Sequence, residues 1–547
     1  MRMIYRLIVL IVSSFSAVAS PAVYNPNTSQ AHFYILQVND TYKIEGLEHG
    51  ARGGFARLRT LRKTLEKEGR VLLLHGGDIL YPSVMSKYLQ AEPIIKIMNL
   101  LDGDAAAFDA NFIATYGNHE FDNPEPSIVL KRTAESGFSW VATNLRFREN
   151  KDDPGEPLAR RSWNIHERMI YEVNGLKLGV FGLTLDTQPQ DYIAYDYAPD
   201  IRRALVRKTI DELRRDGAQM MIAVTHESLE QDEWLAREFP EIALIAGGHE
   251  HFHIQKQVGQ TWITKADSDS QSAVVYDIAL AEGQPLITAP RKIMLDGSIP
   301  EDPEIKQAVN AYIKQLSAAL KAKTGHDGTQ VYGWTKNLLE GEETAVRRRE
   351  TALGNFLTDT MRSRMGADIA FVNGGGIRIN DNIPPGPITG YDLEGIFYFD
   401  NALVSFELTG GELLDILRNS IANVHVGDGR FLQVSGIRFK YHKRGTGEAP
   451  CYEINERDVE ILAAGSDRYK PLDSKRIYKA ATTDFIWEWG YRDGYALFQK
   501  GRGGASPARL DGGEKIGFRA AVEEALARLP SRTVTTVTEG RIESMGD

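Results

Sequence analysis

Residues 112–122 read FIATYGNHEFD, and this stretch decides how the first half of the chain is interpreted. An apolar run passes directly into a turn whose polar side chains suit metal binding or proton transfer. Four more apolar runs, at 32–38, 71–75, 221–225 and 242–246, also lead into Asp or His. Such runs, alternating with helical patterns, indicate βαβ units and an α/β layered domain. Because ligands gather outside the carboxyl ends of the strands in such sheets, the five strand ends predict a single site.

The polar residues at these strand ends form a set of nitrogen and oxygen donors. Its members are Asp40, Asp78, Asn118, His119, His226, His249 and His251. Two divalent cations about 4 Å apart need roughly four to six such donors, with one carboxylate shared between them. Asp78 suits the shared position because its two oxygens can reach both ions. The single cysteine, Cys451, excludes a cysteine metal site and an intramolecular disulfide.

Length and composition describe an ordinary globular chain of more than one domain. Single hydrophobic cores stop growing at about 250–300 residues, so 547 residues predict two large domains. The chain has 42% hydrophobic and 25% charged residues, which excludes a mainly disordered or fibrous protein. Its net charge of −10 argues against a nucleic-acid partner bound through a basic surface. We expect a small-molecule substrate, and a monomer by default.

The N-terminus has the features of a signal peptide, predicted here over residues 1–21. Arg2 and Arg6 precede the apolar run 7–12, and Ala17-Val18-Ala19 supplies a cleavage site with small residues. Three serines shorten the apolar stretch below the roughly 20 residues that span a bilayer, which favours secretion over anchoring. In a two-membrane bacterium the mature protein would be periplasmic. We expect no stable membrane insertion elsewhere in the chain.

The remaining chain divides into a first domain at 30–298, a connecting segment at 299–329 and a second domain at 330–547. Apolar spacing from Glu301 to Thr324, with basic residues in the last turn, predicts a connecting helix. The second domain shows a helical pattern at 353–365, a glycine turn at 374–376 and β-like runs near 403–408 and 436–442. These features predict a second α/β domain.

Two groups of motifs resemble known families. Gly77-Asp78, the hexapeptide 117–122 and Gly248-His249-Glu250-His251, in this order, resemble the calcineurin-like metallophosphoesterase superfamily. Residues 349–355 (RETALGN) and 373–378 (NGGGIR) resemble the C-terminal domain of the 5′-nucleotidase family, which includes periplasmic UDP-sugar hydrolases. The resemblance implies a four-layer β-sandwich flanked by helices, joined by the linker helix to an α/β substrate-binding domain.

The resemblance also implies a dinuclear metal centre of Zn, Mn or Fe, with divalent or mixed-valence ions. One ion would take Asp40, Asp78 and His251, and the other would take Asp78, Asn118, His226 and His249. His119 would stabilise the transferred phosphoryl group or protonate the leaving oxygen, and Asp122 would orient His119. A metal-bound hydroxide would attack phosphorus in line.

Two departures from the family pattern concern tyrosines. Family members commonly have Asp-x-His at the first strand end, whereas this chain reads Asp40-Thr41-Tyr42. Tyr81 follows Asp78 by three residues, a spacing similar to purple acid phosphatases, where the tyrosine binds ferric iron. One hypothesis is that a tyrosinate from Tyr42 or Tyr81 makes the first position prefer Fe(III) or tolerate Mn. The alternative, which we favour, is that Tyr81 packs in its loop and Tyr42 only hydrogen-bonds a ligand.

The second domain is expected to bind the nucleotide. Arginines bind phosphate or carboxylate bidentately, and Arg349 and Arg378 are the predicted pair. The resemblance places Asn373 and Gly375 beside them, Phe399 on one face of the base and Asp493 on the ribose. For the other face, Phe485 fits by strand alignment and Trp487 by counting back from Asp493, and we choose Phe485. The loop before Asp493 carries Tyr491-Arg492 where the family has Gly-Gly.

The resemblance, together with the predicted signal peptide, implies a secreted, metal-dependent phosphohydrolase that releases phosphate from 5′-nucleotides. An alternative is that the same fold hydrolyses a different bond. The substrates would then be 2′,3′-cyclic phosphodiesters, UDP-sugars, dinucleotides or the sulfur esters of related thiosulfohydrolases. A third interpretation is a degenerate nucleotide-binding protein. The presence of both His119 and Asp122 argues against it, because a binding module needs no acid with an orienting carboxylate.

Overall fold

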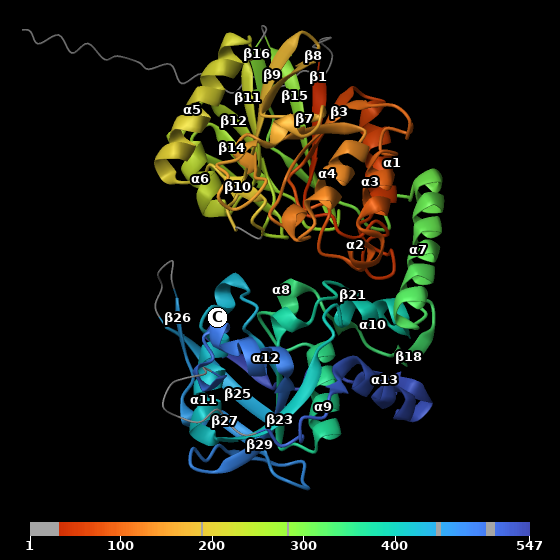
Figure 1. The fold of residues 1–547 in the computed structure, drawn as a ribbon, viewed down its shortest axis with the longest axis vertical. Coiled ribbons are helices and arrows are strands. Elements are labelled where there is room, and N and C mark those ends of the chain that lie inside the picture. The colour runs from red at the N-terminus through yellow and green to blue at the C-terminus, as the bar shows by residue number, and fades with distance from the viewer. Residues whose placement is uncertain (1–31, 188–189, 282–283, 445–449, 499–508, 547) are drawn as a thin grey trace, which may run out of the picture.

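A computed structural model describes residues 32–187, 190–281, 284–444, 450–498 and 509–546 (Figure 1). The predicted signal peptide lies outside the described residues. Among the helices that the structure describes, none is long and apolar enough to cross a membrane.

Two β-sheets form the centre of the first domain. The first has the order β16-β15-β1-β2-β3-β4-β7, with β17 paired to β15, and the second has the order β13-β14-β12-β11-β9-β8. Their strands are β1 (His32–Val38), β2 (Arg70–His75), β3 (Asp109–Thr115), β4 (Phe138–Val141), β7 (Ile165–His166), β8 (Arg168–Val173), β9 (Leu176–Thr184), β11 (Met220–His226), β12 (Ile242–Gly247), β13 (Ile254–Val258), β14 (Thr261–Lys265), β15 (Ser272–Ala281), β16 (Gln284–Ile287) and β17 (Arg291–Met294). The five strands predicted from apolar runs are β1, β2, β3, β11 and β12.

Helices cover the outer face of each sheet, which makes the four layers that the family resemblance implies. One apolar cluster fills the space between the sheets, where β1 and β2 face β9, β11 and β12. A second cluster joins the outer face of the first sheet to α1 (Phe55–Glu66), α3 (Glu92–Met98), α4 (Pro126–Glu135) and α7 (Pro303–Thr324). A third joins the second sheet to α5 (Pro199–Arg215) and α6 (Leu229–Glu238). The parallel strands are apolar on both faces because both faces are covered.

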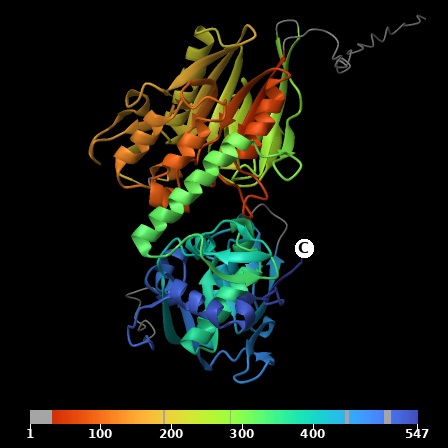
Figure 2. The same ribbon diagram turned by 90° about the vertical axis from the view of Figure 1, so that its right-hand side faces the viewer.

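Helix α7 is the connecting helix predicted from Glu301 to Thr324. Asp302 caps its first turn by accepting from the backbone N–H groups of Glu304 and Ile305, and Gly325 ends it in a left-handed conformation. Its apolar side packs against the core of the first domain through Ile305, Val309 and Leu316. Figures 1 and 2 show it running along the side of that domain, with its C-terminal end at the second domain. The part of the chain that no longer packs against the core of the first domain in this way therefore begins after α7.

The second domain also combines sheets and helices. One sheet has the order β24-β20-β29-β23-β30 and another β26-β25-β27-β28, with β32 paired to β25. Besides the strands described below, these are β24 (Leu432–Ser435), β26 (Cys451–Glu453), β27 (Val459–Leu462), β28 (Tyr469–Pro471), β29 (Ile477–Thr483), β30 (Ile516–Gly517) and β32 (Ile542–Met545). The elements used below are α8 (Glu343–Val346), α9 (Ala352–Met365), β20 (Ile369–Asn373), the short 3-10 turn η3 (Gly374–Gly376), α10 (Gly390–Ile396), β23 (Ala402–Thr409), β25 (Ile437–Arg444) and α12 (Asp484–Trp489). The predicted helix at 353–365 is α9, and the two β-like runs are β23 and β25.

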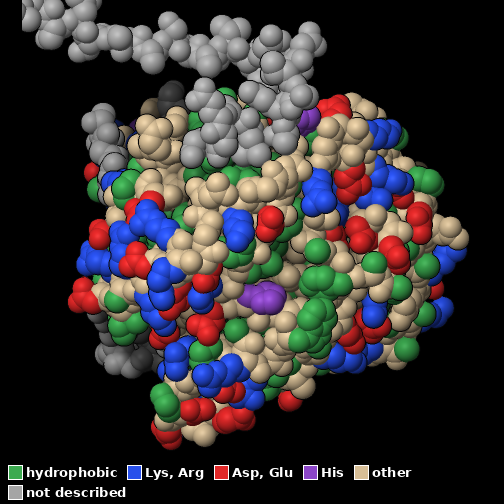
Figure 3. Space-filling view, turned by 90° about the horizontal axis from the view of Figure 1, so that it is seen from above, with side chains coloured by type: hydrophobic (Ala, Val, Ile, Leu, Met, Phe, Trp, Pro, Cys, Tyr) green, Lys and Arg blue, Asp and Glu red, His purple; other side chains and the backbone are tan. Residues whose placement is uncertain are grey.

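On the face of the first domain that points away from the second, basic and acidic side chains are interspersed (Figure 3).

Glycines let the strand ends of the two sheets approach one another. A Cβ on Gly117, after β3, would lie 2.1 Å from Asp78 Oδ1 and 2.6 Å from the Asp78 nitrogen. A Cβ on Gly248, after β12, would lie 2.4 Å from the Gly76 oxygen and 3.0 Å from Asp40 Oδ2. Any side chain at either position would push apart the loops that carry Asp40 and Asp78, so the motif glycines are a packing requirement of the site.

Gly117→Ala is expected to displace the Asp78 carboxylate. We expect bound metal to fall below half of the wild-type content, and the free energy of unfolding to fall by about 1–3 kcal/mol from overpacking. Elemental analysis and denaturant unfolding measure the two quantities. Gly297→Ala is the matched control, because a Cβ there meets nothing within 4 Å. A Gly117→Ala protein with full metal content would contradict this account of the site.

Candidate metal centre and substrate pocket

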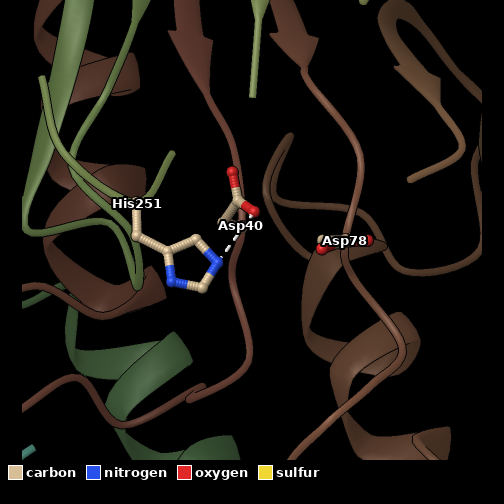
Figure 4. A group of neighbouring side chains, drawn as sticks. All are labelled: Asp40, Asp78 and His251. Carbon is tan, nitrogen blue, oxygen red and sulfur yellow. Dashed lines mark ion pairs between the residues drawn. The ribbon is translucent and has the colours of Figure 1, made fainter. Parts of the chain in front are cut away.

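Asp40, Asp78 and His251 come together at the carboxyl ends of β1, β2 and β12. Each of the three offers a ligand atom, and these atoms lie within 4.8 Å of one another (Figure 4). His251 Nε2 lies 3.2 Å from Asp40 Oδ1. All three residues, with His249, have positive φ, between 53° and 91°. L-residues adopt this conformation at a cost of about 1–3 kcal/mol, and such strain concentrates at functional sites.

The predicted ligands of the second ion lie beside this group. His226 Nε2 is 3.2 Å from Asp78 Oδ2, and the rings of His226 and His249 are 5.3 Å apart. The other nitrogen of His226, Nδ1, lies 2.7 Å from the Gly76 carbonyl oxygen, which fixes the ring. Asn118 Oδ1 is buried and forms no hydrogen bond with any described residue, whereas the buried His226 Nε2 is paired with the Asp78 carboxylate. Buried polar atoms rarely lack a partner, so the Asn118 oxygen fits the role of a metal ligand together with His226 and Asp78.

Burial and charge give the ligands opposite protonation tendencies. Burial opposes ionisation of Asp40, but His226 and His251 outweigh it and hold its pKa well below its usual range. Burial also opposes the charged form of His226, yet Asp78 and Asp40 raise its pKa to about 9. At His249, burial and the charge of His226 lower the pKa to about 4, so its imidazole is neutral and ready to bind metal. The carboxylates and imidazoles of the site therefore offset one another's charge, and metal ions that bind here would displace protons.

His119 and Asp122 form the predicted pair next to the metal ligands. His119 Nδ1 lies 2.8 Å from Asp122 Oδ2, and the backbone N–H of His119 donates to Asp78 Oδ1 at 2.9 Å. Burial opposes protonation of His119, but the carboxylates of Asp78 and Asp122 raise its pKa above the ordinary value. His119 lines the pocket described below. The pair thus presents an oriented imidazole beside Asp78.

Sequence reasoning missed the role of Glu120, the next residue in the hexapeptide. Its buried carboxylate accepts backbone N–H groups of Asp78 (3.0 Å) and Leu80 (3.1 Å), and also those of Gly117 and Ile79. It therefore joins the loop after β2 to the loop after β3. Its place between Asn118 and Asp122 was the only available signal, because the partners are backbone groups that no motif records.

The two tyrosines occupy different positions. The Tyr42 hydroxyl lies 3.0 Å from Asp78 Oδ2, 3.3 Å from Asp40 Oδ1 and 3.1 Å from His251 Nε2. Burial and the two carboxylates raise the pKa of Tyr42 well above its usual value, so the metal-free phenol keeps its proton. The Tyr81 hydroxyl instead accepts a hydrogen bond of 3.0 Å from Asn123. The structure thus brings Tyr42 into the metal site and places Tyr81 against a different loop.

A cavity of about 690 Å³ lies between the two domains and includes the metal site. The first domain contributes Asp78, His119, His249 and His251, and the second contributes residues from α8, α10 and the segment 377–381. Glu343 of α8 reaches the site directly, with Oε2 3.4 Å from His251 Nδ1. His251 and Arg347 outweigh the burial of Glu343 and lower its pKa well below the usual range. A carboxylate on the outer nitrogen of a histidine ligand orients the imidazole, a role the sequence did not reveal.

Polar contacts hold the domains in this arrangement. Lys43 Nζ lies 3.0 Å from Asp381 Oδ2, and His49 Nε2 lies 3.0 Å from Asp392 Oδ1. The Tyr391 hydroxyl donates to Glu45 at 2.7 Å. All three pairs join the loop after β1 to the second domain. The loop that carries Asp40 and Tyr42 therefore also contacts the second domain.

The two predicted phosphate-binding arginines have different surroundings. Arg378 lines the interdomain cavity and forms no ion pair with any described residue. Arg349 lies outside the cavity, with 57% of its side chain exposed and both of its outer nitrogens bonded to Glu340 at 2.7 and 2.9 Å. Arg347 lines the cavity instead and pairs with Glu343. The register of α8 explains the difference, because Arg347 follows its last turn whereas Arg349 points to Glu340.

The predicted base-binding residues lie on the surface of the second domain. Phe399 and Phe485 are 51% and 40% exposed, and neither lines the cavity. Trp487, the alternative to Phe485, packs its ring 5.2 Å from that of Phe406, against the core. Arg378 lies 5.9 Å from the Phe399 ring centre, so a predicted phosphate-binding residue and a predicted base-binding residue lie side by side here.

The other predicted substrate residues follow strand and helix ends. Asn373 ends β20, and its buried Oδ1 forms no hydrogen bond with any described residue. Gly375 lies in η3, where its N–H donates to the Gly429 carbonyl at 2.9 Å. Asp493 ends the turn after α12; burial and the charge of Asp428 raise its pKa. The structure brings Asn373 and Gly375 together at one turn and places Asp493 on the segment after Phe485.

Both domains match described families. Residues 33–253 match the calcineurin-like phosphoesterase family, and residues 331–499 match the 5′-nucleotidase C-terminal domain. The trifunctional nucleotide phosphoesterase protein YfkN of Bacillus subtilis is 26% identical over 516 residues, 87% of this chain and 33% of that protein. This chain thus spans about a third of YfkN. A snake venom 5′-nucleotidase from Crotalus adamanteus is 25% identical over 527 residues, 89% of this chain and 84% of that protein.

Solved structures share the whole architecture. A 5′-nucleotidase precursor from Thermus thermophilus superposes with a TM-score of 0.70 and 25% identity, over 94% of this chain and 100% of that chain. The sulfate thiohydrolase SoxB from the same organism shares the fold, with a TM-score of 0.64 and 18% identity over 96% and 98% of the two chains. With both family models matched along this chain, over residues 33–253 and 331–499, the chain belongs to the 5′-nucleotidase family and is a phosphoesterase with a calcineurin-like first domain.

Proposed function

We propose that this protein is an exported two-metal phosphohydrolase that releases phosphate from 5′-nucleotides. The observation that carries the proposal is the convergence of Asp40, Asp78 and His251, next to His226 and the unpaired oxygen of Asn118, directly beside the His119–Asp122 pair. One ion would be held by Asp40, Asp78 and His251, and the other by Asp78, Asn118, His226 and His249. Bound cations at these positions would activate a water molecule and neutralise phosphoryl oxygens.

The protein's own residues supply the remaining chemistry. Asp122 engages His119 Nδ1, which leaves Nε2 available to the cavity to stabilise the phosphoryl group or to protonate the leaving oxygen. Arg378 is a cation without an ion-pair partner among the described residues, and it faces the same cavity, where it would orient the phosphate. Phe399 and Phe485 would stack on the base, with Asn373, Gly375 and Asp493 around the rest of the nucleoside. The paired Arg349 would need to leave Glu340 to join them.

A substrate panel tests the proposed reaction. Phosphate release would be measured from AMP, UDP-glucose, 2′,3′-cyclic AMP and an aryl phosphate, with chelator and after Mn, Zn or Fe is restored. We expect chelator-sensitive hydrolysis that favours AMP over the aryl phosphate. If the protein prefers the cyclic ester or the UDP-sugar, hydrolysis of that bond would be its reaction on the same fold. If no phosphate is released with any of the metals, the result would support a nucleotide-binding protein instead.

His119→Asn is expected to lower kcat on AMP by about 10²- to 10⁴-fold, because general acid catalysis is lost while every proposed metal ligand remains. Bound metal, measured by elemental analysis, should stay near the wild-type content. His166→Asn is the control, since His166 ends β7 away from the cavity. A parallel loss of metal and activity in His119→Asn would instead assign His119 to metal binding.

Phe399→Ala and Phe485→Ala are each expected to raise KM for AMP by about 5- to 150-fold. This range corresponds to the ~1–3 kcal/mol that stacking on a base contributes. KM for a small aryl phosphate should change much less, because its ring does not reach both aromatic side chains. Trp334→Ala, at an exposed aromatic in the same domain, is the control. Equal losses on both substrates would place the base elsewhere.

Export is part of the proposal and rests on Arg2, Arg6 and Ala17-Val18-Ala19. The related snake venom 5′-nucleotidases are consistent with it. N-terminal sequencing of the protein from a two-membrane bacterial host should show cleavage near residue 21 and recovery in the periplasm. An intact Met1 in the cytoplasmic fraction would refute export.

A further inference from the structure

The Tyr42 hydroxyl lies among the three donors proposed for the first metal ion. It lies 3.0 to 3.3 Å from the nearest atoms of Asp78, Asp40 and His251, and only 4% of Tyr42 is exposed. The hydroxyl of Tyr81, the other candidate, is bonded to Asn123 instead. A cation bound by the three donors would therefore have the phenolic oxygen of Tyr42 as its immediate neighbour.

The loop after β1 holds Tyr42 firmly in this position. Asp269 Oδ1 accepts from the backbone nitrogens of Tyr42 (2.9 Å) and Lys43 (3.0 Å), and the Thr41 N–H donates to the Asp78 carbonyl at 3.0 Å. The ring also packs edge-on against His251, with 5.6 Å between ring centres. Backbone and ring contacts together direct the hydroxyl at the site, so its placement does not depend on the hydrogen bonds it makes there.

We propose that the phenolate oxygen of Tyr42 is itself a ligand of the first metal ion and makes this position select a trivalent cation such as Fe(III). The inference rests on the proposed two-metal function and deepens it. On binding, the phenolic O–H bond breaks, the oxygen donates both electrons of the new bond to the cation, and the proton leaves to solvent. The iron is supplied as Fe(III), so no change of oxidation state is involved.

The charges of the two donor sets explain the selectivity. The first ion would face three anionic donors, from Asp40, Asp78 and Tyr42, with one imidazole. The second would face one shared carboxylate, one amide and two imidazoles. Hard anionic oxygens favour small, highly charged cations, whereas imidazole-rich sets suit Zn(II). In the opposing arrangement, which the sequence alone favours, the phenol stays protonated and donates a hydrogen bond to Asp78 without binding the ion. That arrangement predicts no preference for a trivalent cation.

Visible spectroscopy of the full mature chain separates the two arrangements. The metal-free protein would be loaded with Fe(III) and Zn(II), and iron content and absorption would be measured on the same sample. We expect a phenolate-to-iron charge-transfer band in the wild type and in Tyr81→Phe, and its complete loss in Tyr42→Phe. Tyr42→His should lose the band while keeping iron, because imidazole is also a ligand. In Tyr42→Phe the preference for Fe(III) over Zn(II) should fall by at least about tenfold.

Two results would overturn the proposal: an iron-loaded wild type without the band, or a band that survives Tyr42→Phe or Tyr42→His. If Tyr42→Phe does not fold, as judged by circular dichroism, Tyr42→His alone decides. Phosphate release from AMP on the same samples keeps the two proposals apart. Hydrolysis without a charge-transfer band would refute only the proposal that Tyr42 is a metal ligand. A band without hydrolysis of any phosphoester would refute only the proposed function.

Discussion

The buried carboxylate of Asp78 is the constraint on which the site depends. Its Oδ1 accepts the backbone N–H of His119, and its Oδ2 faces His226 and the Tyr42 hydroxyl. A buried charge is tolerated only when it is paired and hydrogen-bonded, so the ends of β2, β3 and β11 must meet around this one group. Glu120 secures the meeting by collecting backbone N–H groups from two of the loops. Bare glycines at 117 and 248 then become necessary, because the loops approach too closely for a side chain.

The same constraint connects the metal site to the second domain. The loop after β1 carries Asp40 and Tyr42 on its inner side, and Lys43 and His49 bind the second domain on its outer side. Glu343 completes the link through the outer nitrogen of His251. In this arrangement Arg378 shares a cavity with the metal ligands, while Phe399 and Phe485 stay outside it. We expect that a nucleotide would contact all of them only after the domains move relative to one another. Since α7 packs on the first domain, that change would occur after Thr324.

Local patterns predicted most of the first domain well. The runs that became β1, β2, β3, β11 and β12 are short, apolar and bounded by glycine or polar residues, so their assignment needs no distant contacts. The four layers follow from these strands and the helices between them. The predicted metal ligands also lie together, because parallel strands deliver their carboxyl ends to one edge of the sandwich.

The sequence by itself therefore determined the two-domain α/β architecture and the family, and its contiguous motifs predicted the set of metal-binding side chains. Only the tertiary structure distinguished between alternative residues for the same role. It placed Tyr42 rather than Tyr81 in the site, Arg347 rather than Arg349 in the cavity, and exposed Phe485 while packing Trp487 against the core. It also revealed Glu120 and Glu343 as the groups that hold the loops and the domains. Such choices depend on how loops turn and how two domains meet, and these are set by contacts between residues far apart in the chain.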